Sequence, residues 1–229
     1  MILGLLVAGA VGAFLFWRYV WFWRNPPRVV PAGGNVVSPA DGTVVYVKQV
    51  PPQEKVIAIK QGVAVSVNDI TRQDLQVPKI LIGVFMSPFN VHYNRMPLTG
   101  QIQAVRHYPA QGGNRHMGIM HWRSVWRRRP LYQGSEHISI NERTVTSWRG
   151  TFQGREVHGY IVQIGGKSVH GIDSYVQPGQ IVPKGEIFGM IRIGSQVDLV
   201  LTWLPQMQVQ VKPGDKVYAG TTILITEKV

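Results

Sequence analysis

The stretch IFGMIRIGSQVDLVLTW, from Ile187 to Trp203, indicates the fold of this chain. It contains two runs rich in branched aliphatic residues, 187–193 and 197–203, which only Gly194-Ser195-Gln196 separates. Short apolar runs bounded by glycine are typical of strands buried in a sheet. A glycine followed by a serine would ordinarily be a simple turn between two such strands. The stretch therefore predicts two buried strands that follow each other closely.

Similar segments continue along the chain and predict a mainly β (α+β) domain, arranged as a strand-rich barrel or sandwich. Asn25-Pro26-Pro27 ends a first helix, because proline lacks an N–H group and restricts the residue before it. Short helices are expected only around 115–130. The further predicted strands are Val44–Lys48, Val56–Lys60, Val63–Val67, Lys79–Met86, Glu156–Ile164 and Thr221–Ile225.

One internal repeat, VxPGxxVxxG, occurs at 176–185 and again at 211–220. The Pro-Gly pair predicts a type II turn, and the last glycine predicts a second tight turn. Paired β-turn units of this kind resemble the hammerhead of biotinyl and lipoyl carrier domains. A carrier function is disfavoured, because the chain lacks a Met-Lys-Met hairpin tip. We interpret the repeat as structural.

Residues 1–23 predict a hydrophobic membrane anchor that precedes a catalytic domain at 24–229. Apart from Arg18, this segment holds only apolar, glycine and aromatic residues, and about 20 apolar residues span a bilayer core. Its aromatic residues gather near Arg18, as at a membrane interface. Arg24 and Arg28 follow, which places the remainder on the cytoplasmic side of the cell membrane. A spanning helix, an interfacial helix and a buried core helix remain alternatives.

The composition narrows the classes of chemistry. The chain has 229 residues, with 24 Lys and Arg against 12 Asp and Glu, and no cysteine, which excludes disulfides, thiolate nucleophiles and Cys-ligated metals. Residues 106–155 hold nine arginines and two glutamates, interleaved with tryptophans. Such a surface suits nucleic acid or an anionic membrane. Behind a hydrophobic anchor, the membrane is the favoured partner.

Four short segments could carry chemistry. Each also has a plain structural interpretation: an Asp-Gly turn, a structural histidine, a local ion pair and a Gly-Ser turn. His92 follows an apolar strand, on a strand-exit loop of the kind that often bears functional groups. The segments are Ser38-Pro39-Ala40-Asp41-Gly42, Met86–Pro97 with His92, Asn141-Glu142-Arg143, and Gly194-Ser195.

Taken together and in this order, the four segments resemble the phosphatidylserine decarboxylase family, in its short, pyruvoyl-dependent proenzyme form. The resemblance covers about residues 24–205 and includes FGxIRxGSxVD at Phe188–Asp198. It implies decarboxylation of phosphatidylserine to phosphatidylethanolamine. It also implies self-cleavage between Gly194 and Ser195 into a large subunit, 1–194, and a small subunit, 195–229, which remain associated.

The resemblance implies a covalent cofactor, a pyruvoyl group formed from Ser195, with neither a metal nor pyridoxal phosphate. Its ketone would form a Schiff base with the substrate amine and accept electrons as carbon dioxide leaves. His92 would donate the proton, and Asp41 would orient or charge-stabilise a base during self-cleavage.

The chain departs from the larger family members at two positions. Arg95 stands where they carry a second histidine that acts as the base for self-cleavage, and arginine cannot act as a base near neutral pH. Either His92 serves both steps or another histidine substitutes. Gln196 replaces a threonine that is common in the larger enzymes.

The expected partners are phosphatidylserine, or an ether-lipid analogue, in an anionic membrane, but not nucleic acid. Whether the chain forms a homo-oligomer is left open. Two alternatives belong to other classes. One is a membrane-tethered β-barrel adaptor without catalysis. The other is a lysostaphin-type zinc endopeptidase, which needs HxxxD and HxH ligands; the chain offers only His170-Gly171-Ile172-Asp173.

Overall fold

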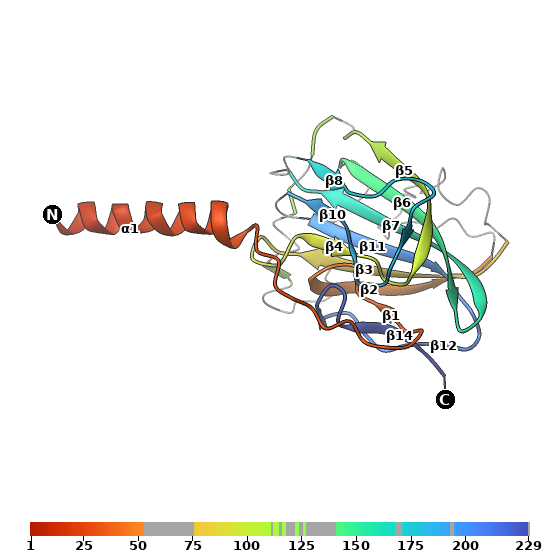
Figure 1. Cartoon of the computed structure of the whole chain (residues 1–229). Helices are drawn as coiled ribbons and strands as arrows, with labels where there is room; N and C mark the ends of the chain where they lie inside the picture. The colour runs from red at the N-terminus through yellow and green to blue at the C-terminus, as the bar shows by residue number, and fades with distance from the viewer. Residues whose placement is uncertain are drawn as a thin grey trace.

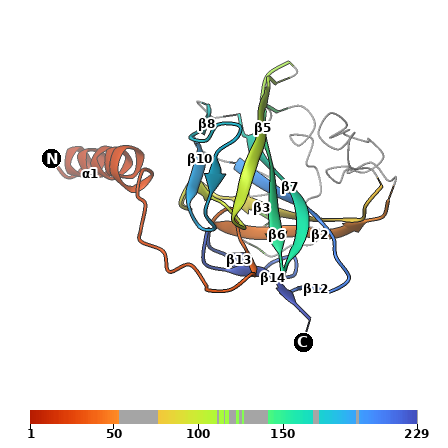
Figure 2. The ribbon, with the colours of Figure 1, turned by 45° about the vertical axis from the view of Figure 1, so that its right-hand side comes forward.

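The computed structural model describes residues 1–52, 76–110, 112–114, 116–117, 122–123, 126, 141–167, 171–192 and 195–228. The predicted strands at 56–60 and 63–67, most of the helical region predicted around 115–130, and Gly194 lie outside these residues. Strands dominate the described part, and the largest sheet curls into a half-barrel (Figures 1 and 2). The mainly β prediction is therefore confirmed.

The N-terminal segment forms helix α1 (Ile2–Phe16), which continues into a wider helical turn, η1 (Trp17–Trp21). Helix α1 projects away from the strands, and none of its residues is buried (Figure 1). Residues 2–21 are long and apolar enough to cross a membrane, with a mean hydropathy of 1.7. A wholly exposed helix of this composition needs an apolar partner, because exposed aliphatic surface is unfavourable in water.

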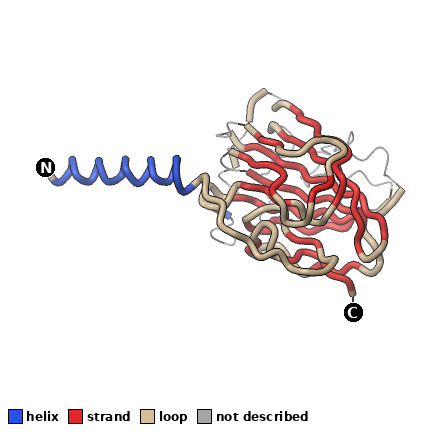
Figure 3. The backbone as a smooth tube through the Cα atoms, viewed as in Figure 1, coloured by secondary structure: helices blue, strands red, loops and turns tan. Residues whose placement is uncertain are grey.

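Within the described residues, eight strands form one antiparallel sheet in the order β13-β2-β3-β11-β7-β6-β5-β9. Two three-stranded sheets, β1-β14-β12 and β4-β10-β8, accompany it (Figure 1). Figure 3 shows the helix on one side and the strands gathered on the other. The strands up to β7 are β1 (Val36–Val37), β2 (Gly42–Val50), β3 (Lys79–Met86), β4 (Tyr93–Arg95), β5 (Gly100–Tyr108), β6 (Arg143–Phe152) and β7 (Arg155–Gly165). The later strands are β8 (Ile172–Ser174), β9 (Ile181–Val182), β10 (Ile187–Ile191), β11 (Ser195–Thr202), β12 (Met207–Val209), β13 (Lys216–Val217) and β14 (Ile223–Glu227).

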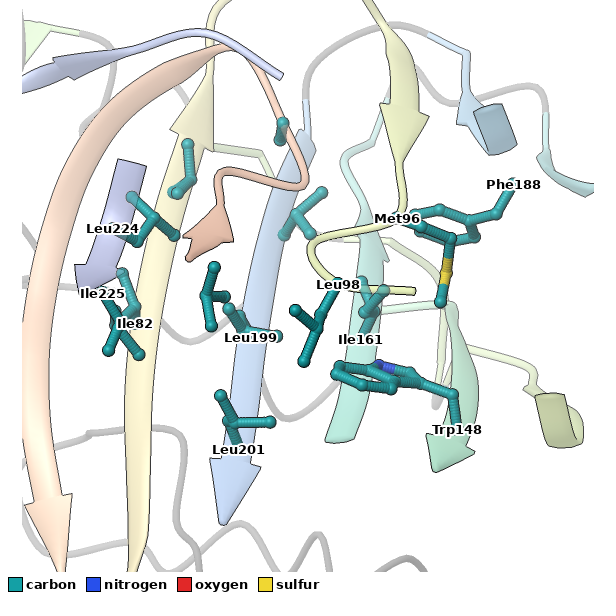
Figure 4. Packing of buried hydrophobic residues seen from close by; sticks show 14 of the residues in the cluster. Ile82, Met96, Leu98, Trp148, Ile161, Phe188, Leu199, Leu201, Leu224 and Ile225 are labelled. Carbon is teal, nitrogen blue, oxygen red and sulfur yellow. The ribbon is translucent and has the colours of Figure 1, made fainter. Parts of the chain in front are cut away.

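The large sheet has two different faces, because side chains alternate along each strand. On one face Val197, Leu199 and Leu201 of β11 join the main core, against residues from both small sheets, including Phe188 and Leu224 (Figure 4). On the other face lies a second cluster, which includes Tyr46, Phe85, Val162 and Val200. Strand β11 therefore runs between two buried apolar layers.

The two copies of the repeat lie at the two edges of the large sheet, in β9 and β13. At one edge Ile102 donates its N–H to Gln180 and accepts the N–H of Gly179; at the other edge Val44 does the same with Asp215 and Gly214. Gly179 and Gly214 both adopt positive φ, at 90° and 102°, as the predicted turns require. The repeat is thus part of a pseudo-symmetric arrangement, which confirms its structural interpretation.

The symmetry extends to the loops before β2 and β5. The sequence Pro39-Ala40-Asp41-Gly42 matches Pro97-Leu98-Thr99-Gly100, and the two loops are cross-linked by reciprocal backbone bonds, Arg95 N to Pro39 O and Val37 N to Pro97 O, both of 2.9 Å. A Cβ atom on Gly42 would lie 2.1 Å from the carbonyl oxygen of Phe85, so only glycine allows β2 to approach β3 this closely. The Asp-Gly pair therefore begins a strand and does not form a simple turn.

The prediction of β3 was correct to the residue, and those of β7, β10, β11 and β14 were correct to within a few residues. The prediction missed β5 and β6, whose polar and arginine residues suggested a surface. These strands alternate polar with apolar residues, and Ile102, Val145 and Trp148 are buried. Strand β7, the hairpin partner of β6, pairs Arg155 with Phe152 at one end and Gly165 with Ser195 at the other, so Arg149 and Arg155 lie far from Ser195 along the sheet.

Candidate active site

Ser195 is the first residue of β11 and is fully buried. It is paired with Met86, the last residue of β3, on one side and with Gly165, the last residue of β7, on the other. Its hydroxyl donates a hydrogen bond to the sulfur of Met86 at 3.3 Å. Because a thioether is a weak acceptor, this hydrogen bond orients the hydroxyl but takes little free energy to break.

A chain of buried amides continues from the Met86 sulfur. The side-chain nitrogen of Asn94, on β4, lies 3.8 Å from the same sulfur, and the oxygen of Asn94 accepts a 2.8 Å hydrogen bond from Gln163 Nε2 on β7. Both amides are fully buried, and Gln163 Oε1 has no hydrogen-bond partner among the described residues. A buried oxygen of this kind is an acceptor left open for another group.

His92 lies in the loop between β3 and β4 and is also fully buried. Its backbone oxygen accepts the N–H of Ile191, the last residue of β10, at 3.3 Å. Ile191 precedes Ser195 by only four positions, so His92 contacts the chain at a point close in sequence to the start of β11. The structure thus brings together the predicted histidine and the approach to the predicted cleavage point.

The imidazole of His92 is held in one tautomer. Its Nδ1 lies 2.9 Å from the carbonyl oxygen of Asn90, which can only accept, so Nδ1 carries the hydrogen. Its Nε2 is buried without a partner among the described residues, so it offers a free lone pair. Burial lowers the pKa of His92 to about 4, with a smaller contribution from the charge of Arg24. The ring is therefore neutral at pH 7.

The end of the N-terminal helical segment covers His92. Phe22 is fully buried, and its ring centroid lies 4.5 Å from that of His92. Trp17 contacts both Phe22 and Phe89, and the Arg24 guanidinium donates to the carbonyl oxygen of Phe89 at 2.6 Å. The loop that carries His92 is thus attached to the segment that leaves the helix.

Asp41 is buried and has two different partners. Its Oδ1 accepts the backbone N–H of Ala219 at 2.7 Å, and its Oδ2 forms a 2.8 Å ion pair with Arg28. The first contact recurs in the pseudo-symmetric loop, where Thr99 Oγ1 accepts the N–H of Lys184 at 3.0 Å. The contact with Ala219 is therefore a feature of the fold, whereas the ion pair with Arg28 is specific to this side.

Arg95 takes part in the same region as a structural cation. Its guanidinium donates to the carbonyl oxygen of Gly185 and to Asn25 Oδ1, both at 2.8 Å. Its backbone bond to Pro39 joins the loop of Asp41 to the loop of His92. The residue that replaces the expected second histidine thus links the anchor linker to the site.

Asn141, from the Asn-Glu-Arg segment, supports Ser195 indirectly. Its side-chain nitrogen donates to the carbonyl oxygen of Gly165 at 2.6 Å, and Gly165 is the residue paired with Ser195. The Gly165 N–H in turn donates to Glu142 O at 2.9 Å. All four segments that the sequence singled out therefore meet at one end of the sheet.

The sequence interpretation missed Phe22, Arg28 and Gln163 as residues of this region, and it gave Asn94 no role beyond its place in the segment Met86–Pro97. For Gln163 a signal existed, since a lone amide interrupts the apolar strand 156–164. Among the described residues no group of three His, Asp or Glu side chains could hold a metal ion.

Comparison with known proteins identifies the family. The sequence profile described as phosphatidylserine decarboxylase matches residues 15–225. This chain belongs to the phosphatidylserine decarboxylase family. It is 33% identical over 222 residues to the phosphatidylserine decarboxylase proenzyme of Nitrosomonas eutropha, covering 95% of this chain and 83% of that protein. The proenzymes of Chlorobium chlorochromatii, at 34% identity over 96% and 82%, and of Chlorobaculum parvum, at 32% over 96% and 83%, are similarly related.

Membership in the phosphatidylserine decarboxylase family makes the chain an enzyme of phospholipid metabolism and confirms the resemblance carried by the four segments. Neither the non-catalytic adaptor nor the zinc endopeptidase is supported by these relationships.

Proposed function

We propose that this chain is a membrane-bound proenzyme that cleaves itself between Gly194 and Ser195 and then decarboxylates phosphatidylserine. The observation that carries this proposal is the position of Ser195: a buried serine at the start of a central strand, four positions after Ile191, whose N–H bonds to His92 O. The products would be a large subunit, 1–194, and a small subunit, 195–229. Pairing of β11 with β3 and β7 would hold them together, because ladder hydrogen bonds do not need an intact chain.

Cleavage begins when Ser195 Oγ attacks the carbonyl carbon of residue 194 and loses its proton. The C–N bond breaks, the nitrogen of Ser195 takes up a proton, and an ester replaces the amide. Loss of a proton from Cα of residue 195 then expels the carboxylate of residue 194. Water replaces the nitrogen of residue 195, which leaves as ammonia, and a pyruvoyl end remains.

His92 is the base that we assign to the first step. Its Nε2 has a free lone pair, because Nδ1–H is held by Asn90 O, and the ring is neutral at pH 7. The same atom would return the proton to the departing nitrogen. Arg95 cannot take this part, since its guanidinium is occupied by Gly185 and Asn25. A single histidine would therefore serve both in self-cleavage and as the proton donor in decarboxylation.

For Asp41 we propose the role of orienting or charge-stabilising that base. Its buried carboxylate forms a hydrogen-bonded ion pair with Arg28, in the loop that Arg95 joins to the loop of His92. Its bond to Ala219 fixes the position of the loop, and its ion pair with Arg28 fixes the orientation of the carboxylate.

The residues around Ser195 fit a pyruvoyl group. Position 195 is fully buried, next to two buried amides, and one amide oxygen, Gln163 Oε1, is open to a partner such as the substrate amine. The pyruvoyl group would supply the electrophilic carbonyl that binds the serine amine and withdraws electrons as carbon dioxide leaves. Around it, Asn94 and Gln163 would orient the headgroup. The apolar side chains of the main core, on the same face of β11, would exclude water.

A lipid substrate would give the exposed N-terminal helix a function. Helix α1 and η1 would anchor the chain in the cell membrane, with the catalytic domain on the cytoplasmic side, as Arg18, Arg24 and Arg28 favour. Because Phe22 touches His92, the helix leaves the domain at the end where Ser195 lies. A headgroup in the bilayer surface would thus face the site directly.

Denaturing electrophoresis with a lipid assay tests the proposal. The wild-type chain should yield a fragment of about 4 kDa, from its 25.6 kDa and 229 residues, and should convert phosphatidylserine to phosphatidylethanolamine. Ser195→Ala should remain uncleaved and inactive. An uncleaved Ser195→Ala variant that still decarboxylates the lipid would overturn the proposal. Ether-linked and ester-linked lipids, assayed side by side, would identify the tails.

A further inference from the structure

A second group of buried polar side chains lies on the opposite face of β11 from Ser195. Because side chains alternate, Gln196 and Asp198 share their face with Val200 and point away from the main core. Both are buried, and they meet Tyr46 of β2, which belongs to the second apolar cluster. Neither self-cleavage nor decarboxylation, as described above, uses this group.

The three side chains form a closed triangle. Tyr46 donates its hydroxyl hydrogen to Asp198 Oδ2 at 2.6 Å, and Gln196 Nε2 donates to Asp198 Oδ1 at 2.7 Å. Gln196 Nε2 also donates to the Tyr46 hydroxyl oxygen at 2.8 Å. Both hydrogens of the Gln196 amide are therefore directed at fixed partners, so this side chain has one orientation.

The triangle is costly, because its neighbours on this face, such as Phe85 and Val162, are apolar. Burial raises the pKa of Asp198 to about 6, even though the hydrogen bonds from Tyr46 and Gln196 lower it. Well-packed apolar residues would stabilise the same face at least as well. Buried groups with perturbed pKa values that are kept at such a cost occur preferentially at functional sites.

We propose that Gln196 is a positioning residue, which the Tyr46–Asp198 pair holds in place so that residue 195 stays fixed before and after self-cleavage. The inference rests on the proposed cleavage between Gly194 and Ser195. It gives a function to the residue that replaces the threonine of the larger enzymes.

Cleavage itself creates the need for such a device. Before cleavage, Ser195 is held by the chain on both sides and by pairing with Met86 and Gly165. Afterwards residue 195 is a chain end without an N–H group, and strand ends fray readily. Gln196 is then the first complete residue of the small subunit. Its side chain, bound to Tyr46 of the large subunit, prevents this end from moving.

The test compares Gln196→Leu with Val200→Ala in the full-length chain, purified in detergent. Gln196→Leu removes both hydrogen bonds at similar volume, whereas Val200→Ala weakens the same face of β11 farther from Ser195. We expect self-cleavage and the kcat of the cleaved enzyme to fall at least about tenfold in Gln196→Leu, since small displacements of reacting groups cost this much or more. The KM should change little, and Val200→Ala should cleave within about twofold of wild type.

Thermal unfolding of both variants on a Ser195→Ala background gives the reference for stability. If Gln196→Leu does not fold, Tyr46→Phe is used in its place. This variant removes one hydroxyl from the triangle and should also slow self-cleavage. If Gln196→Leu, or Tyr46→Phe in its place, has the same cleavage rate and kcat as Val200→Ala, the inference about Gln196 is overturned. The proposed function would then still stand. A wild-type chain that is never cleaved would overturn the proposed function and the inference with it.

Discussion

The ring of Phe22 lies against the imidazole of His92, with 4.5 Å between the ring centroids and both side chains fully buried. Phe22 is the residue that follows η1, so the end of the anchor segment directly shields the histidine assigned as base. This contact links the N-terminal helical segment to the burial that lowers the pKa of His92.

Phe22→Ala should raise the pKa of His92 from about 4 toward 6.5, because burial is the main cause of the lowered value. NMR titration of the full chain in micelles, with His92→Gln to assign the signal, measures this pKa. Tyr19→Ala is the matched control, since Tyr19 is an exposed aromatic residue of the same segment. Equal pKa values in Phe22→Ala and wild type would show that Phe22 does not shield the ring.

The buried neutral His92 should make the fold sensitive to acid. Above pH 6.5 the ring is neutral in both the folded and the unfolded state, so it contributes no pH dependence. As the pH falls from 6.5 to 4, the unfolded chain binds a proton and the folded chain does not, so stability is lost. The expected loss between pH 7 and pH 4.5 is about 2 kcal/mol. Urea unfolding of Ser195→Ala at pH 7 and pH 4.5 measures it. Adding His92→Gln should remove most of this loss of stability. If the pH dependence is unchanged in that variant, groups other than His92 cause the loss.

The pseudo-symmetric loop supplies a substitution that separates the two roles of Asp41. Asp41→Thr should keep the bond to Ala219, because Thr99 makes the equivalent bond to Lys184, but it removes the charge that Arg28 pairs with. We expect Asp41→Thr to slow self-cleavage by at least about tenfold. Asp41→Ala, which loses both contacts, should be less stable than Asp41→Thr by about 1 kcal/mol. If Asp41→Thr cleaves itself at the wild-type rate, self-cleavage does not depend on the charge of Asp41.

The amide pair Asn94–Gln163 should be important for stability as well as for the site. Asn94→Leu leaves Gln163 Nε2 buried without its 2.8 Å partner, which should cost about 2–3 kcal/mol in unfolding free energy. Met86→Leu conserves volume and loses only weak sulfur contacts, so its cost should stay below about 1.5 kcal/mol. Urea unfolding on a Ser195→Ala background measures both. Equal costs for the two substitutions would mean that the amide pair contributes nothing specific.

Local patterns predicted much of this molecule, because strand periodicity and turn glycines are properties of neighbouring residues. Strand β3 and the turns at Gly179 and Gly214 followed from such patterns. Strands β5 and β6 did not, because their arginines suggested a surface, although alternate side chains are buried.

The candidate site divides in the same way. Ser195, His92 and Asp41 were found through short segments, and the structure brings those segments to one end of the sheet. The contacts of Phe22 with His92 and of Arg28 with Asp41 could not be predicted. They depend on where the linker after the helix crosses the domain, which no local pattern encodes.

The central claim is that the bond between Gly194 and Ser195 is broken in the active enzyme and that Ser195 no longer carries a hydroxyl group. Intact-mass measurement of purified, active material tests this most directly. We expect two polypeptides, with the smaller one beginning at position 195 and bearing a pyruvoyl group in place of serine. A single chain of 25.6 kDa that decarboxylates phosphatidylserine with an unmodified Ser195 would contradict it.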